Sequence, residues 1–208
     1  MPPSPVPESD PPSPRSPLKR EPPPVLIIPG LNNSAPDHWQ SHWQAALPNA
    51  HRVEQSDWDR PTLGEWVQSL VHAVRANPGA ILVGHSLGCA LIAHVAHLRG
   101  RRGIAGALLV ASADVNRDGP AGRLLEGFGP MPRGRLPFPS TVVASRNDPY
   151  ARFELSQAVA RDWGAQFVDL GAAGHINVEA GYGPWREGQT LLDALIDRPP
   201  PAEQGGPY

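Results

Sequence analysis

Residues 80–91 read AILVGHSLGCAL, a stretch in which a serine lies between two glycines where a short apolar run meets residues that favour a helix. The apolar run from Ala80 to Val83 is typical of a buried strand. The small and apolar residues after Gly88 predict a helix. Ser86 at such a junction either caps the helix or acts as a nucleophile. Residues elsewhere in the chain distinguish these two roles.

The five residues Gly84-His85-Ser86-Leu87-Gly88 match the pattern G-x-S-x-G of a nucleophile elbow. In such an elbow the serine projects from a sharp turn between a strand and a helix, so that a substrate carbonyl can reach its hydroxyl. The glycines are needed because larger side chains two residues either side of the serine would collide. The N–H groups of the new helix, that of Leu87 first, point to where an oxyanion forms. We therefore expect Ser86 to be the nucleophile rather than a cap.

A serine nucleophile needs a base and an acid, and hydrolases with this elbow carry them in the order serine, acid, histidine. Asp148 follows an expected strand at 140–145, and His175 lies in a glycine-flanked loop after an expected strand at 165–170. Both would lie at the carboxyl edge of the sheet, where open α/β sheets place their active sites. Asp114 also follows a strand and is the second choice for the acid.

The other histidines are weaker candidates for the base, because they lie inside the elbow, within expected helices or away from the strand ends: His85, His72, His94, His97 and His51. His38 and His42 have the i, i+4 spacing of zinc ligands on a helix. A metalloprotease would need glutamate at position 39, and no third ligand is evident. We expect neither a metal nor a cofactor.

A second oxyanion donor should come from the turn after the first strand, which reads PGLNNS at residues 29–34. The backbone N–H of Leu31 or of Asn32 could face the site beside that of Leu87. Asn32 and Asn33 are equally typical of a simple turn. The candidate pocket residues are Asn33 from this turn and the three tryptophans Trp39, Trp58 and Trp185. For any one tryptophan, a place in the core or on the surface is more common.

Short apolar runs alternate with longer amphipathic ones along the chain, which predicts βαβ units and a mainly parallel sheet. The expected strands are 25–28, 52–55, 80–83, 103–112, 140–145 and 165–170. The expected helices are 34–47, 62–77, 88–99, 150–163 and 184–196. Ser34 or Ala35 would cap the first, and a Thr62–Glu65 capping box would open the second. Right-handed crossovers place helices on both faces, so the fold class is a three-layer α/β/α sandwich. The long segment 113–139 has no clear element, and a loop of this length in a compact domain is often functional, for example as a wall of the pocket.

The two ends of the chain differ from the middle in composition. The first 24 residues hold 11 of the 27 prolines and little that is apolar, so residues 1–24 read as a disordered tail. Residues 198–208 read the same way, which leaves one domain at 25–197. The stretch PPSPRSP could bind a protein partner with an SH3-type groove, although such tails are more often spacers.

Charge and hydropathy exclude several classes of partner. The formal net charge is −2 without a basic stripe, which argues against nucleic acid and anionic membranes as partners. There is no run of about 18 apolar residues and no signal-like apolar region at the start of the chain. The one cysteine, Cys89, fits a reducing compartment, so we expect a cytoplasmic protein.

Longer motifs around these residues resemble the small serine hydrolase family that includes retinoblastoma-binding protein 9 and many bacterial proteins. The resemblance runs from about Val25 to Ile196, and it is carried by IIPGLNNSAPDHWQSHW, SDWDRPTLGEW, GHSLGC, SRNDPY and GHINVEAGYGPWREG. It implies a minimal α/β-hydrolase without a cap domain, which begins at the third strand of larger relatives. It also implies a triad of Ser86, Asp148 and His175. The chain has no L-x-C-x-E motif, so a retinoblastoma-type partner is not implied.

These residues predict hydrolysis of a carboxylic ester, thioester or amide of a small-molecule acyl substrate through an acyl-enzyme. His175 would accept the proton of Ser86, and Asp148 would hold the imidazole. Two alternatives remain open. One is a binding module on a hydrolase scaffold whose catalysis is weak or lost, and the other is an acyltransferase that shares the first half-reaction.

Overall fold

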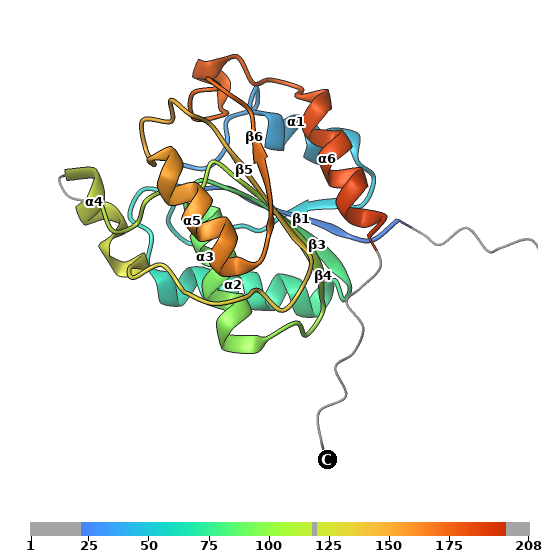
Figure 1. Cartoon of the computed structure of the whole chain (residues 1–208). Helices are drawn as coiled ribbons and strands as arrows, with labels where there is room; N and C mark the ends of the chain where they lie inside the picture. The colour runs from blue at the N-terminus through green and yellow to red at the C-terminus, as the bar shows by residue number, and fades with distance from the viewer. Residues whose placement is uncertain (1–21, 118–119, 199–208) are drawn as a thin grey trace, which may run out of the picture.

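Six parallel strands form a single sheet in the order β2-β1-β3-β4-β5-β6 in the computed structural model, which describes residues 22–117 and 120–198 (Figure 1). The strands are β1 (Val25–Ile28), β2 (Ala50–Arg52), β3 (Ala80–His85), β4 (Ile104–Val110), β5 (Ser140–Ala144) and β6 (Gln166–Asp169). The helices are α1 (Trp39–Ala46), α2 (Leu63–Ala76), α3 (Leu87–Arg99), α4 (Pro120–Leu125), α5 (Phe153–Trp163) and α6 (Arg186–Ile196). Two short 3₁₀ turns are η1 (Glu126–Phe128) and η2 (Val178–Ala180).

Helices cover both faces of the sheet, as the sequence predicts. Helices α1 and α6 lie on one face, and α2, α3 and α5 lie on the other (Figure 1). Because successive side chains of a strand point to opposite faces, β1 contributes Val25 and Ile27 to one core and Leu26 and Ile28 to the other. All four are buried, as expected of a parallel strand between two helical layers. The fold is a minimal α/β-hydrolase fold.

The chain changes direction between β1 and β3, and this change opens the site. After β1 it continues outward to β2 and then returns to form β3 on the other side of β1. Helix α1, which follows β1, and helix α3, which follows β3, therefore pack on opposite faces. The loops at the carboxyl ends of these two strands diverge, and ligands of open α/β sheets bind in such a crevice.

Two expected elements are shifted. Helix α1 begins at Trp39 instead of residue 34, because His38 is the N-cap. The backbone of His38 is extended, and its side chain accepts the backbone N–H of Gln40. Ser34 does not cap, since its hydroxyl donates to the side chain of Gln40. The second strand lies at Ala50–Arg52 instead of 52–55, because the short β1 offers it partners only from Val25 to Ile27.

The segment at 113–139 contains more structure than its sequence indicates, namely α4 and η1. Thr62 is the N-cap of α2 as expected. In a capping box the side chains of Thr62 and Glu65 would each bond to a backbone N–H, but here the Thr62 hydroxyl donates to the Glu65 carboxylate. The two expected tails fall almost entirely outside the described residues. Among the residues that are described, no helix is both long and apolar enough to cross a membrane.

Candidate active site

Ser86 occupies the turn between β3 and α3 with the backbone angles φ 53° and ψ −119°. A positive φ is strained for a residue with a side chain, and such strain is typical of functional positions. Ser86 is the N-cap of α3 by position, but its side chain makes no capping hydrogen bond. The hydroxyl is therefore free for another role, and it faces a pocket. The elbow expected at this turn is present.

Close contacts between the elbow and the chain around the end of β1 explain two glycines, Gly88 of the elbow and Gly30 of the turn after β1. A Cβ atom at Gly88 would lie 2.8 Å from the carbonyl oxygen of Pro29 and closer still to that of Ile28. A Cβ atom at Gly30 would lie 2.9 Å from the Cβ of Ser86 and 3.1 Å from the nitrogen of Leu87. These distances are too short for real side chains. The turn after β1 and the elbow can therefore pack together only because both positions are glycine.

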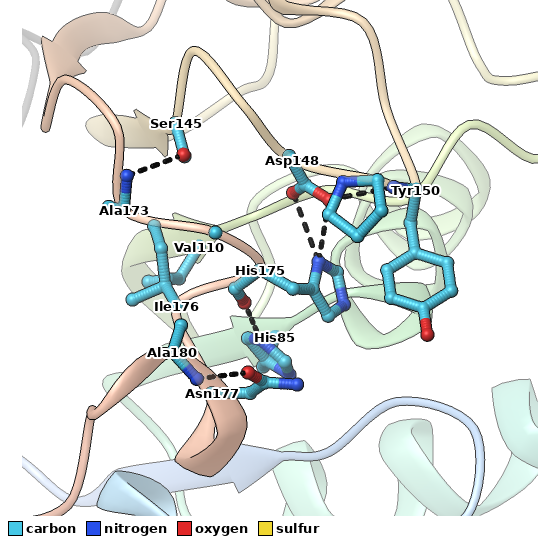
Figure 2. A network of polar contacts seen from close by, with 12 residues as sticks. His85, Val110, Ser145, Asp148, Tyr150, Ala173, His175, Ile176, Asn177 and Ala180 are labelled. Carbon is cyan, nitrogen blue, oxygen red and sulfur yellow. Dashed lines mark hydrogen bonds and ion pairs between the residues drawn. The ribbon is translucent and has the colours of Figure 1, made fainter.

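His175 and Asp148 form a buried pair beside the elbow. The Nδ1 atom of His175 lies 3.0 Å from each carboxylate oxygen of Asp148, and the two side chains are only 9% and 3% exposed (Figure 2). The backbone N–H of Tyr150 donates to the same carboxylate, and its ring lies 4.5 Å from that of His175. An ionised carboxylate accepts, so Nδ1 carries the proton and Nε2 keeps its lone pair. Asp114, the second choice for the acid, instead accepts the N–H of Asn116.

Two side chains before Asp148 bind the acid loop to the histidine loop. The hydroxyl of Ser145 donates to the side-chain oxygen of Asn147. The same hydroxyl accepts the N–H of Ala173 (Figure 2). The side-chain oxygen of Asn147 also accepts the N–H of Gly174, at 2.8 Å. The two loops that carry Asp148 and His175 are thus joined at two points. The SRNDPY motif therefore supplies both the acid and the two side chains, Ser145 and Asn147, that clamp the loops together, and no local sequence pattern predicts this second role.

His85 supports the histidine loop from the elbow. Its Nε2 atom lies 3.0 Å from the carbonyl oxygen of His175, and because a carbonyl accepts, this nitrogen must be the donor (Figure 2). Burial, together with the nearby His175 and His38, lowers the pKa of His85 well below its usual value, so the ring is neutral. From the sequence, His85 is a weak candidate for the base because it lies inside the elbow. Its position directly before the nucleophile was the available signal.

Gln40 links the two strands on either side of the crevice. Its buried amide nitrogen donates to the carbonyl oxygens of Ile28, at the end of β1, and of Val83, near the end of β3. Its oxygen accepts the hydroxyl of Ser34, so all of these polar groups are satisfied. Periodicity cannot reveal such a residue, because a glutamine in a helix is normally exposed.

The three expected oxyanion donors have different surroundings. The N–H of Leu87 begins α3 and has no partner within that helix, as the first helical N–H groups never do. The N–H of Leu31 makes no hydrogen bond to any described residue. The N–H of Asn32 donates to the carbonyl oxygen of Trp58 at 2.9 Å, so it is occupied. The expectation that Asn32 could serve as a donor is therefore corrected, and Leu31 and Leu87 remain.

A pocket of about 250 Å³ opens over these groups. It is lined by Leu31, Asn32, Asn33, His38, His85, Ser86, Leu87, Ala113, Arg117, Leu125, Tyr150, His175, Asn177 and Glu179. Three residues of the segment 113–139 contribute to its lining, namely Ala113, Arg117 and Leu125. Asn33 lines the pocket as predicted, and Ser86 and His175 share it. No hydrogen bond joins these two side chains in the described part of the chain, and such catalytic bonds often tighten only around substrate.

The three tryptophans do not line this pocket, which corrects the expectation from the sequence. Trp39 is fully buried and donates its indole N–H to the carbonyl oxygen of Ile176, beneath the histidine loop. Trp185 packs against Trp39, with the ring centres 5.2 Å apart. Trp58 packs on the ring of Trp66 and contributes to the site only through its carbonyl.

His38 and His42, which have the spacing of zinc ligands, take no part in a metal cluster. Residues 22–117 and 120–198 contain no group of three or more histidine, cysteine, aspartate or glutamate side chains placed to hold a metal ion. One nitrogen of His38 already accepts the N–H of Gln40.

Comparisons with known proteins cover nearly the whole of the described chain. The family model described as serine hydrolase matches residues 25–194. A protein of Pectobacterium atrosepticum assigned as a YdeN-like hydrolase is 36% identical and has a TM-score of 0.75, over 83% of this chain and 90% of that one. The ydeN gene product of Bacillus subtilis is 22% identical and has a TM-score of 0.72, over 85% and 100%.

A more distant structure, the carboxylesterase CesB of Bacillus subtilis, is 12% identical and has a TM-score of 0.60, over 86% of this chain and 85% of that one. At these lower identities the likeness to the two Bacillus proteins shows the fold alone. The comparison with curated proteins gives no match.

Proposed function

The chain belongs to the serine hydrolase family, and from this premise we propose that it cleaves a carboxylic ester of a small molecule through an acyl-enzyme on Ser86. The observation that carries the proposal is the buried His175–Asp148 pair, whose histidine lines the same pocket as Ser86 of the strained elbow. A thioester or an amide would follow the same steps.

In the proposed reaction, the Nε2 atom of His175 accepts the proton of the Ser86 hydroxyl while the serine oxygen attacks the substrate carbonyl. Asp148 holds the ring with its protonated Nδ1 toward the carboxylate and stabilises the imidazolium. The oxyanion accepts hydrogen bonds from the N–H groups of Leu31 and Leu87. The imidazolium then protonates the leaving alcohol, and the C–O bond of the ester breaks.

The second half of the reaction repeats these roles with water. His175 removes a proton from water, which attacks the acyl-enzyme carbonyl, and the proton then passes to the oxygen of Ser86. The carboxylic acid leaves. The close packing of the turn after β1 on the elbow and the hydrogen bonds that join the two loops support the proposal, because they limit how far the catalytic groups can move.

Steady-state hydrolysis of p-nitrophenyl acetate and p-nitrophenyl butyrate tests the proposal. We expect the wild type to turn over at least one of them. Ser86→Ala should lower kcat at least about 10³-fold, because the nucleophile is lost. His72→Ala, a substitution on the solvent side of α2, is the matched control and should keep kcat. Wild-type protein that is folded by circular dichroism but has no activity on either ester would contradict the proposal and favour a binding module.

A further inference from the structure

The pocket contains an imidazole that the proposed reaction does not use. His38 immediately precedes α1, is only 6% exposed and lines the pocket together with Ser86 and His175. Its ring lies 4.8 Å from that of His85. A buried histidine of this kind needs a physical account, because each of its nitrogens must either donate or accept.

Hydrogen bonding fixes where the proton of His38 lies. Its Nδ1 atom accepts the backbone N–H of Gln40 at 3.2 Å, which caps α1. That nitrogen is therefore unprotonated, and in the neutral ring the proton is on Nε2. Burial, reinforced by the positive charge of Arg52, lowers the pKa of His38 to about 4. At neutral pH the His38 ring is thus uncharged, and its one N–H donor is on Nε2.

The other two imidazoles of the pocket already use their N–H groups. His85 donates to the carbonyl oxygen of His175, and His175 donates to Asp148. The Nε2–H of His38 has no acceptor among the residues that the structure describes. The oxygen of the neighbouring Asn33 is also occupied, because it accepts from Ser34 and from Arg52.

The lining of the pocket is mixed in polarity. Its polar side chains come from the β1–α1 loop, the histidine loop and the segment 113–139: Asn32, Asn33, His38, Arg117, Asn177 and Glu179. Apolar residues and the ring of a tyrosine line it as well: Leu31, Ala113, Leu125 and Tyr150. A substrate that fills this pocket therefore meets both hydrogen-bonding groups and apolar surface. A plain alkyl ester would leave the N–H of His38 buried without a partner, which is unfavourable.

We propose that His38 is a specificity-determining residue whose Nε2–H donates to a hydroxyl or carbonyl oxygen of the substrate. The preferred substrates would then be esters that carry an oxygen substituent close to the scissile carbonyl, on the acyl or the alcohol side. The inference rests on the proposed esterase function and adds the substrate class. No covalent step is assigned to His38.

Two matched pairs of esters test this inference. The first compares p-nitrophenyl 3-hydroxybutyrate with p-nitrophenyl butyrate, and the second compares 2,3-dihydroxypropyl butyrate with propyl butyrate. The wild type should have the higher kcat/KM for the hydroxylated member of at least one pair. His38→Asn keeps a side-chain oxygen that caps α1 but is too short to reach the substrate. It should lower that preference about fivefold to tenfold, the usual effect of one lost neutral hydrogen bond.

His42→Asn, one helical turn further along α1 and outside the pocket lining, is the control and should keep the wild-type preference. If His38→Asn folds poorly in a thermal melt, His38→Ser repeats the test with another capping oxygen. An unchanged preference in a folded His38 variant would overturn the inference. An equal loss on both members of each pair would also overturn it, because it would indicate a general role such as oxyanion binding. Wild-type protein inactive on all four esters would instead overturn the esterase function itself.

Discussion

The two edges of the sheet use the left-handed backbone conformation in different ways. In the segments that lead into strands, at the amino edge, the described residues with positive φ are all glycine: Gly79, Gly100, Gly103, Gly134 and Gly164. In the segments that follow strands, at the carboxyl edge, some are glycine but six are not: Asn32, Asn33, Ser86, Ala111, Ile176 and Trp185.

The difference shows where side chains are needed. A non-glycine residue in this conformation costs about 1–2 kcal/mol, and glycine avoids that cost. The turns of the amino edge only reverse the chain, so glycine is sufficient there. At the carboxyl edge the side chains of Ser86 and Asn33 face the pocket, so the strain accompanies a group that glycine lacks. Strained side chains therefore mark the candidate site independently of any motif.

The largest effect is expected from the acid at the carboxyl edge. Asp148→Asn should lower kcat on the order of 10⁴-fold, because the amide NH₂ can donate to Nδ1 and so favour the wrong tautomer of His175, and because a neutral amide stabilises the imidazolium poorly. Asp114→Asn is the matched control, since an asparagine there still accepts the N–H of Asn116. Steady-state kinetics of the two variants would contradict the assignment if Asp114→Asn were the more damaging.

The next largest effect is expected on the stability of the protein, when Gly88 and Gly64 are each replaced by alanine. Gly88→Ala should lower the free energy of unfolding by about 3 kcal/mol, because its Cβ would strike the carbonyl oxygens of Ile28 and Pro29. Gly64→Ala, in the first turn of α2 with nothing within 4 Å of its Cβ, should leave stability equal or raise it by up to about 1 kcal/mol. Urea unfolding measures both. Equal stability of the two variants would mean that Gly88 does not pack closely against the carbonyl oxygens of Ile28 and Pro29.

The clamp between the loops should have a smaller effect on activity. Asn147→Ala removes the oxygen that accepts from Ser145 and Gly174, and should lower kcat roughly 10- to 100-fold with less change in KM, because His175 is less well placed. Arg146→Ala, which breaks the exposed ion pair with Asp169 beside the clamp, should stay within about twofold of the wild type. A KM effect without a kcat effect in Asn147→Ala would argue against a positioning role.

The smallest effect is expected from a substitution at the amino edge of the sheet, Gly79→Ala. Gly79→Ala meets no atom within 4 Å but must adopt a φ of 80°, so it should cost about 1 kcal/mol of stability. Its kcat/KM, measured on folded protein, should equal that of the wild type. Lost activity with unchanged stability would mean that the two edges are not separate in function.

Much of the fold could be predicted from the sequence because strands buried on both faces read as apolar runs, such as VLII before α1 and AILV before the elbow. The elbow, the acid and the histidine were found because each follows a strand in the expected order. The start of α1 was missed because a histidine, rather than Ser34, caps it. Gln40 and His85 were missed because their roles depend on partners distant in sequence, the carbonyl oxygens of β1, β3 and the histidine loop.

Labelling with a fluorophosphonate probe tests the central claim most directly, because the probe reacts with activated serine hydroxyls. Wild type, Ser86→Ala and His175→Ala would be compared by intact mass and peptide mapping. The account predicts one label on the wild type, located on Ser86, none on Ser86→Ala, and much slower labelling of His175→Ala. Folded wild-type protein that stays unlabelled, or a label on another serine, would contradict the claim that His175 and Asp148 activate Ser86.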